Sequence, residues 1–135
     1  RNSQNRVVIR FDEMPDDDDA LHIQGNEALL KTALLNLMEN ACKFSDNHEV
    51  VVSLKANHAF TVLEFTDKGI GIPQEELPYI FEPFYRAHNT RTVKGHGIGL
   101  SLVQRIIKIH GGIIDVVSRV GEGTTFKVVF MRNMN

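Results

Sequence analysis

Two long segments with helical periodicity are each followed by two short segments with strand periodicity, and this order constrains the fold more than any other feature of the sequence. The helical segments are residues 27–44 and 98–110, and the paired strand segments are residues 49–56 with 59–66 and residues 113–118 with 124–130. Helices interleaved with hairpins predict an α+β fold. We expect a two-layer α/β sandwich, with helices on one face of a mixed, mostly antiparallel sheet.

Shorter elements complete the pattern. Asn26 is a suitable N-cap for the first helix, and Gly111 and Gly112 are suited to ending the second. The remaining expected elements are a strand at residues 7–11, an acidic loop at 12–19, a short strand at 21–24, helical turns at 74–84 and an aperiodic polar segment at 85–94.

Composition excludes several classes of protein. A chain of 135 residues with 42% hydrophobic residues fits one domain, residues 1–135. A net charge of −2 argues against a surface that follows nucleic-acid phosphates. The longest apolar run, Val128–Met131, has four residues, far fewer than the ~20 that cross a bilayer.

The cysteine count and the first residue carry further expectations. Cys42 is the single cysteine, so it forms no internal disulfide, and no histidine or cysteine spacing matches a zinc site. This favours a reducing compartment. The chain begins at Arg1, without a methionine or a leader pattern, and reads as a piece of a longer protein.

A polar stripe runs along the first helix. Asn36, Asn40 and Lys43 fall on one side, with Thr32 adjoining and Phe44 at the border. The stripe is explained either by solvation or by a phosphate and metal site, in which a neutral amide oxygen binds Mg²⁺ and the lysine faces phosphate. No glutamate shares this side, so no general base for activating water is evident.

Two glycine clusters, residues 67–73 and 95–100, point to phosphate chemistry of an uncommon kind. The second runs directly into a helix, whose N-terminus and backbone amides suit an anion. Neither cluster matches a Walker A loop or a dinucleotide fingerprint. Asp67 enters the first cluster, where its carboxylate is either an ordinary turn residue or an acceptor for an amine such as adenine N6.

Four motifs in one order then point to a family. The chain closely resembles the N, G1, F and G2 boxes of the catalytic ATP-binding domain of sensor histidine kinases, in the GHKL superfamily that includes gyrase and mismatch-repair ATPases. The resemblance covers residues 25–130 and implies the Bergerat fold with a mobile ATP lid. The motifs are Asn36–Ser45, Asp67–Pro73, Phe81–Arg86 and Gly95–Leu102, followed by a closing glycine motif at Gly121–Phe126.

The resemblance implies ATP and Mg²⁺ as cofactors. Asn40 would hold the metal with Asn36 nearby, and Lys43 would contact phosphate. The amides of Gly97, Gly99 and Leu100 would meet the phosphates. The implied contacts of this last segment comprise Gly95, His96, Gly97, Ile98, Gly99 and Leu100.

For the base, the resemblance implies a second group of residues. Asp67 would bind the adenine amine directly or through water, and Gly69 and Gly71 would let the backbone approach. The rest of the implied base-binding set consists of Phe44, Ile72 and Thr124.

Residues 85–94 would form the lid. Arg86, Arg91 and Lys94 are candidates to reach the γ-phosphate, and Asn36, Lys43 and Arg86 are the implied catalytic residues. His96, between two glycines, is expected to face solvent rather than to act as a catalyst.

None of the six histidines lies in a phosphoacceptor motif, so we expect the acceptor on a separate dimerisation domain of the same parent. The parent would be an ATP-dependent histidine kinase of a two-component system, anchored in the bacterial inner membrane with this part in the cytoplasm and a response regulator downstream. The isolated domain should hydrolyse ATP slowly. The alternatives are a GHKL-type ATPase or clamp, a nucleotide-binding regulatory module without kinase activity, and an anti-sigma-type serine kinase.

Overall fold

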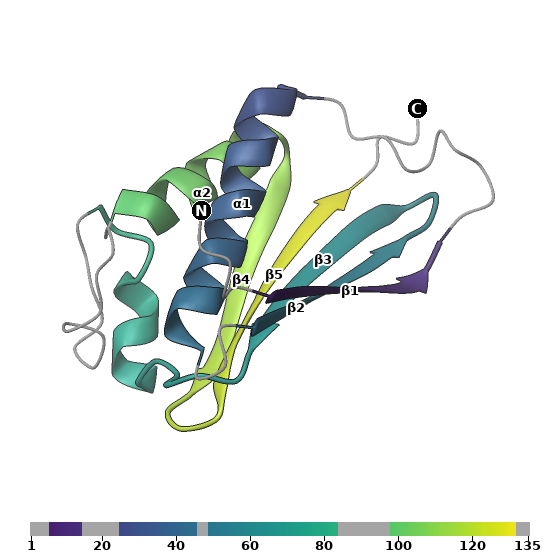
Figure 1. Ribbon diagram of the computed structural model, residues 1–135. Coiled ribbons are helices and arrows are strands. Elements are labelled where there is room, and N and C mark those ends of the chain that lie inside the picture. The colour runs from purple at the N-terminus through teal and green to yellow at the C-terminus, as the bar shows by residue number, and fades with distance from the viewer. Residues whose placement is uncertain (1–5, 15–24, 46–48, 84–97, 132–135) are drawn as a thin grey trace.

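The computed structural model describes residues 6–14, 25–45, 49–83 and 98–131 (Figure 1). In chain order its elements are β1 (Arg6–Glu13), α1 (Glu27–Phe44), β2 (Glu49–Ala56), β3 (Phe60–Asp67), the 3-10 helix η2 (Gln74–Tyr79), α2 (Ile98–Ile109), β4 (Gly112–Arg119) and β5 (Gly123–Met131). Among these residues no helix has both the length and the apolar character that a membrane crossing requires.

The five strands form one sheet in the order β1-β2-β3-β5-β4. Strands β1 and β2 are parallel, and the other three pairs are antiparallel. Both long helices pack on the same face of this sheet (Figure 1). The expected two-layer α/β sandwich, with a mixed and mostly antiparallel sheet, is therefore confirmed.

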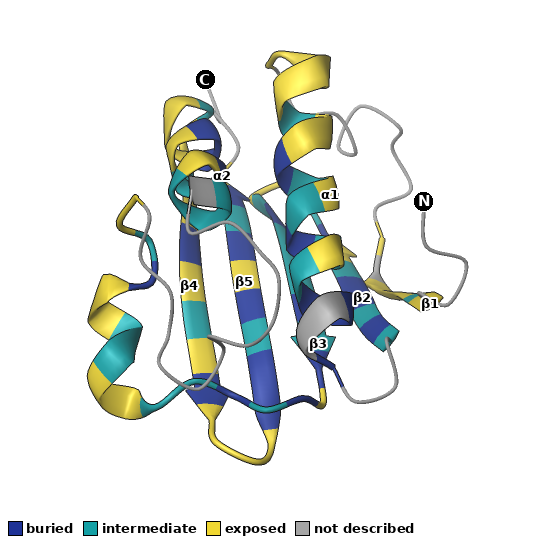
Figure 2. Cartoon of the chain, turned by 60° about the vertical axis from the view of Figure 1, so that its left-hand side comes forward, coloured by how far each residue is buried: buried dark blue, intermediate teal, exposed yellow. Residues whose placement is uncertain are grey.

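The core lies between the helices and the sheet, where dark blue positions alternate along the central strands (Figure 2). Side chains from both layers are fully buried there, including Leu37 and Ala41 of α1, Val103 and Ile107 of α2, Phe65 of β3 and Val128 of β5. The apolar side of α1 thus faces the sheet, although Leu30, Leu34 and Met38 on that side are only half-buried.

Helix boundaries follow their local signals. α1 begins after Asn26, whose side chain accepts a hydrogen bond from the Leu29 N–H at 3.0 Å, as the N-cap prediction requires. α2 ends at Ile109, one residue earlier than expected, and Gly111 follows with φ 77°. Gly112 is the first residue of β4 rather than part of the cap.

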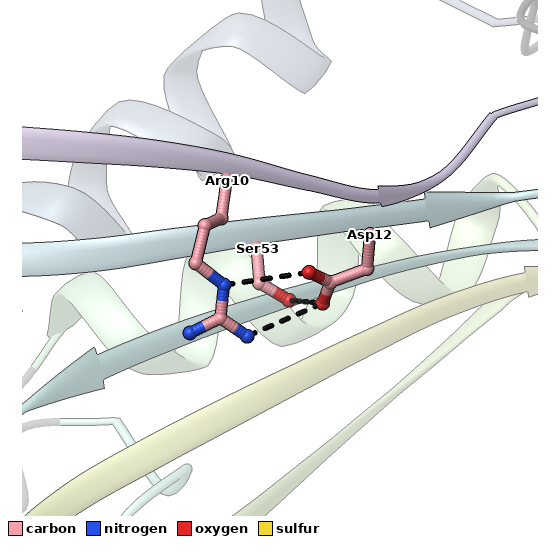
Figure 3. Close-up of polar contacts among 3 residues, drawn as sticks. All are labelled: Arg10, Asp12 and Ser53. Atoms are coloured by element: carbon pink, nitrogen blue, oxygen red, sulfur yellow. Dashed lines mark hydrogen bonds and ion pairs between the residues drawn. The ribbon is translucent and has the colours of Figure 1, made fainter.

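Strand β1 is longer than predicted and includes the first acidic residues of the expected loop. Pairing with β2 extends it to Glu13. The Asp12 carboxylate accepts hydrogen bonds from the Ser53 hydroxyl at 3.1 Å and from the Arg10 guanidinium at 3.3 Å (Figure 3). These contacts stabilise the carboxylate of Asp12 within a strand, whereas the local preference of aspartate is for a turn. The predicted strand at 21–24 lies outside the described residues.

Candidate functional site

The polar stripe of α1 meets the beginning of α2. Asn36 and Asn40 lie one turn apart, and both are half-buried. Nδ2 of Asn36 donates a hydrogen bond to the backbone oxygen of Thr32 at 2.9 Å. Its Oδ1 faces the first turn of α2, since a Cβ added to Gly99 would lie 4.0 Å from that oxygen. The two asparagines are therefore not part of a fully solvated stripe.

The first turn of α2 offers the complementary chemistry. The first N–H groups of any helix have no acceptor within it and carry partial positive charge. In α2 these groups begin at Ile98 and include Gly99 and Leu100. Helix N-termini of this kind bind phosphate. An amide oxygen from α1 beside such amides gives one place where a cation and an anion can bind together.

A metal ion at this place would depend on amide oxygen. Among the described residues no group of three or more histidine, cysteine, aspartate or glutamate side chains could hold a metal ion. Mg²⁺ keeps several waters and is commonly held by one or two protein oxygens together with substrate phosphates. The Asn40 side chain fits that mode of binding, since its oxygen is a hard and neutral ligand.

Asp67 lies at the end of β3 and is 6% exposed. Its Oδ1 accepts a hydrogen bond from the Gly69 N–H at 2.9 Å, which orients the carboxylate. Gly69 also forms an isolated antiparallel bridge with Ser45, the residue that follows α1. The carboxylate is therefore held in a loop that is joined to the end of the first helix.

The glycine loop 69–73 packs directly on the turn between β4 and β5. Gly71 has φ 75°, and a Cβ there would come closer than 3.0 Å to the carbonyl oxygen of Arg119. A Cβ on Gly123 would come equally close to the carbonyl oxygen of Asp67. The Gly121 N–H donates to the Ile70 oxygen at 2.9 Å. The glycines at 71 and 123 are needed for backbone-to-backbone contact, whatever else they do.

Thr124 of β5 is the partner of Asp67 across β3 and β5. Its hydroxyl lies 2.7 Å from the hydroxyl of Ser118, which also accepts a hydrogen bond from the Ile72 N–H. Ser118 belongs to no sequence motif and is not one of the predicted site residues. The one sequence signal for it is that a serine continues the inward alternation of Ile114 and Val116 on β4.

The remaining predicted site residues divide into two groups. Ile72 and Leu100 are half-buried and pack against the core, so their backbone rather than their side chains can face a ligand. Arg86, Arg91, Lys94, Gly95, His96 and Gly97 lie outside the described residues, as do the side chains of Lys43, Phe44 and Ile98.

Comparison with known proteins identifies the family. Residues 25–133 match the family of histidine kinase-, DNA gyrase B-, and HSP90-like ATPases. The chain belongs to this family. Its relatives, described next, place it within this family as a catalytic domain of the sensor histidine kinase type.

Those relatives are histidine kinases. The signal transduction histidine-protein kinase ArlS of Staphylococcus aureus (strain USA300) is 39% identical over 99 residues, which cover 71% of this chain and 22% of ArlS. The mycobacterial sensor histidine kinase MprB superposes with a TM-score of 0.74 and 30% identity, covering 91% of this chain and 83% of that one. This chain therefore spans about a fifth of the length of the curated relatives that it matches.

Two further structures agree with this ATPase-family fold. The catalytic domain of the histidine kinase ThkA gives a TM-score of 0.71 at 25% identity, covering 93% of this chain and 80% of that domain. Full-length ShkA, solved in complex with AMPPNP, gives a TM-score of 0.70 at 26% identity, covering 92% of this chain and 25% of ShkA.

Proposed function

We propose that this chain binds Mg-ATP and transfers the γ-phosphoryl group to a histidine on a separate dimerisation domain of the same parent. The observation that carries the proposal is that Oδ1 of Asn36 lies 4.0 Å from where a Cβ on Gly99 would stand, so the polar stripe of α1 lies beside the first turn of α2. Family membership supports it, because the family consists of ATPases and histidine kinases.

The phosphate end of the ligand would lie between α1 and α2. Asn40 would bind Mg²⁺ through its amide oxygen, with Asn36 beside it, and Lys43 would face phosphate. The backbone amides of Gly99 and Leu100 would meet the phosphate oxygens. When bound, Mg²⁺ neutralises charge that develops on the phosphates.

The base end would lie where the first glycine loop meets the central strands. Asp67 is buried and oriented by Gly69, so its carboxylate can accept a hydrogen bond from the exocyclic amine of adenine. Thr124 lies opposite Asp67 on the same face of the sheet. The side chain of Phe44 would line the pocket, and Gly69, Gly71 and Ile72 would contribute backbone.

The chain would act by positioning and by charge stabilisation. Phosphoryl transfer requires cationic groups and amides around the γ-phosphate more than covalent chemistry on the protein. Asn36 stands where the gyrase-type ATPases carry a water-activating carboxylate, and the exposed Glu39 lies on another side of α1. A base supplied by the partner domain, with Arg86, Arg91 or Lys94 at the γ-phosphate, completes the proposal.

The residues 1–135 form one domain in this proposal, and the parent is a membrane-anchored, cytoplasm-facing sensor kinase with a response regulator downstream. The expected slow hydrolysis of ATP by the domain alone follows from the amide at position 36. Fast turnover without a partner would instead favour the mechanochemical ATPase alternative.

The test uses γ-labelled ATP and Mg²⁺, with and without the histidine-bearing domain of the parent. Label on a histidine of that domain supports the proposal. Binding without any transfer favours the regulatory alternative, and label on a serine favours the anti-sigma-type alternative.

A second test measures the affinity for ATP by calorimetry. Asn40→Ala removes the proposed metal ligand, and Asp67→Asn removes the charge of the proposed acceptor for the adenine amine. Each variant should lose about ten-fold or more in affinity for ATP.

Matched controls are available for both variants. Glu39→Ala changes the exposed neighbour of Asn40 on α1, and Asp115→Asn removes an exposed charge from β4. Both should bind ATP as the unchanged protein does. Unaltered affinity in Asn40→Ala and Asp67→Asn would refute the assignment of the site.

A further inference from the structure

One buried hydroxyl joins three segments at the base end of the candidate site. Oγ of Ser118 accepts a hydrogen bond from the Ile72 N–H at 2.7 Å and donates one to the Gly123 carbonyl at 3.0 Å. It also lies 2.7 Å from Oγ1 of Thr124. Ser118 is 3% exposed and Thr124 is 8% exposed, so water does not compete freely for these contacts.

All three contacts are hydrogen bonds in only one arrangement of protons. A hydroxyl has one proton and two acceptor lone pairs. The Ile72 N–H can only donate, and the Gly123 carbonyl can only accept. The proton of Ser118 is therefore committed to Gly123, and the proton of Thr124 points to the second lone pair of Ser118.

This arrangement sets the polarity of Thr124. With its proton directed to Ser118, Oγ1 presents lone pairs to a ligand and not a donor. Asp67, its partner across β3 and β5, is a carboxylate and also an acceptor when ionised. Two neighbouring acceptors match an amino group. A carbonyl oxygen at the same place would meet acceptors only.

We infer that Ser118 is a positioning residue that makes this end of the site selective for 6-aminopurines over 6-oxopurines. It acts through Thr124, by holding the proton of that hydroxyl away from the base. The inference rests on the proposed function, because it requires that the base lies beside Asp67 and Thr124.

The test compares ATP with inosine triphosphate, which carries an oxygen in place of the 6-amino group. Calorimetry in the presence of Mg²⁺ gives the ratio of the two affinities. We expect the unchanged protein to prefer ATP and Ser118→Ala to reduce that preference by about ten-fold, because the freed Thr124 hydroxyl can then donate to a 6-oxo group. A purely structural role would lower both affinities together and leave the ratio unchanged, which would overturn the inference.

A matched control lies one residue along β5. Thr125 shares a hydrogen bond of 3.0 Å with Thr66 and faces the other side of the sheet. Thr125→Val also removes a hydroxyl from a hydroxyl pair. Because that pair lies on the other face of the sheet, the variant should leave the preference for ATP unchanged. An equal loss of preference in Thr125→Val would contradict the role of Ser118.

A second measurement needs no substitution at Ser118. NMR of the unchanged protein should detect a slowly exchanging hydroxyl proton on Thr124, close in space to the β protons of Ser118. A Ser118 proton directed at Thr124 would overturn the inference even if Ser118→Ala did not fold. If the unchanged protein bound neither nucleotide, the proposed function would fail first. If it bound ATP with an unchanged ratio in Ser118→Ala, only the role of Ser118 would fail.

Discussion

The ring of His110 joins the end of α2 to the beginning of α1, because its Nε2 accepts a hydrogen bond from the backbone N–H of Asn26 at 2.9 Å. Its Nδ1 donates to the Ile106 carbonyl at 2.7 Å. Both ring nitrogens thus have a backbone partner. Gly25 leaves room for the ring, since a Cβ there would collide with it.

Replacement of His110 with alanine should destabilise the fold. It removes the acceptor for a helix N-terminal N–H and a contact between the two helices. We expect a loss of about 1–3 kcal/mol in the free energy of unfolding, measured in urea. His58→Ala, in the exposed β2–β3 turn, is the control and should change stability by less than about 0.5 kcal/mol. Equal effects at both positions would contradict the bridging role.

Gly71 should tolerate alanine less well than Gly111. Both have positive φ, 75° and 77°, so each pays about 1–2 kcal/mol for a left-handed alanine. Gly111 has open space around a Cβ, whereas Gly71 lies against the backbone of Arg119. Thermal unfolding should therefore show a larger loss of stability for Gly71→Ala than for Gly111→Ala. If the two losses were the same, the close approach of loop and turn would be wrong.

Cys42 should be unreactive in the folded protein. It is 1% exposed, and burial raises the pKa of its thiol above the ordinary value of 9.0. A raised folded pKa contributes stability that is present below the unfolded pKa and is lost as pH rises through the folded one. Near neutral pH, iodoacetamide should alkylate Cys42 only in molecules that have unfolded globally. Lys108→Cys on the exposed side of α2 supplies a thiol that should react without unfolding.

Asp12 should contribute stability above acidic pH. The hydrogen bond from Arg10, and after it that from Ser53, lowers the pKa of this carboxyl below the ordinary 3.8. A lowered folded pKa contributes stability that is present above the unfolded pKa and is lost as pH falls through the folded one. The difference in the free energy of unfolding between the unchanged protein and Asp12→Asn should therefore shrink as the pH falls below the ordinary pKa of this carboxyl. In Arg10→Gln the NMR titration of Asp12 should move upward, and an unmoved midpoint would contradict this cause.

Local structure was largely predictable because its signals are local. The N-cap at Asn26 and the apolar period to Phe44 mark α1 with the bounds observed. Alternation on either side of short turns predicts the hairpins, with strand ends that differ from the observed ones by at most one residue. Strand β1 was predicted too short, because its continuation depends on contacts of Asp12 with Ser53 far along the chain.

The sequence by itself determined the elements, their order and the residue types that suit a nucleotide, since these depend on periodicity, capping and motif spacing. Only the tertiary structure decided which of them meet. That β3 lies beside β5 places Asp67 opposite Thr124, and the packing of α1 on α2 brings Asn36 to Gly99. The hydroxyl of Ser118 is joined to the candidate site for the same reason: a serine acquires a donor and an acceptor role only when distant backbone is packed around it.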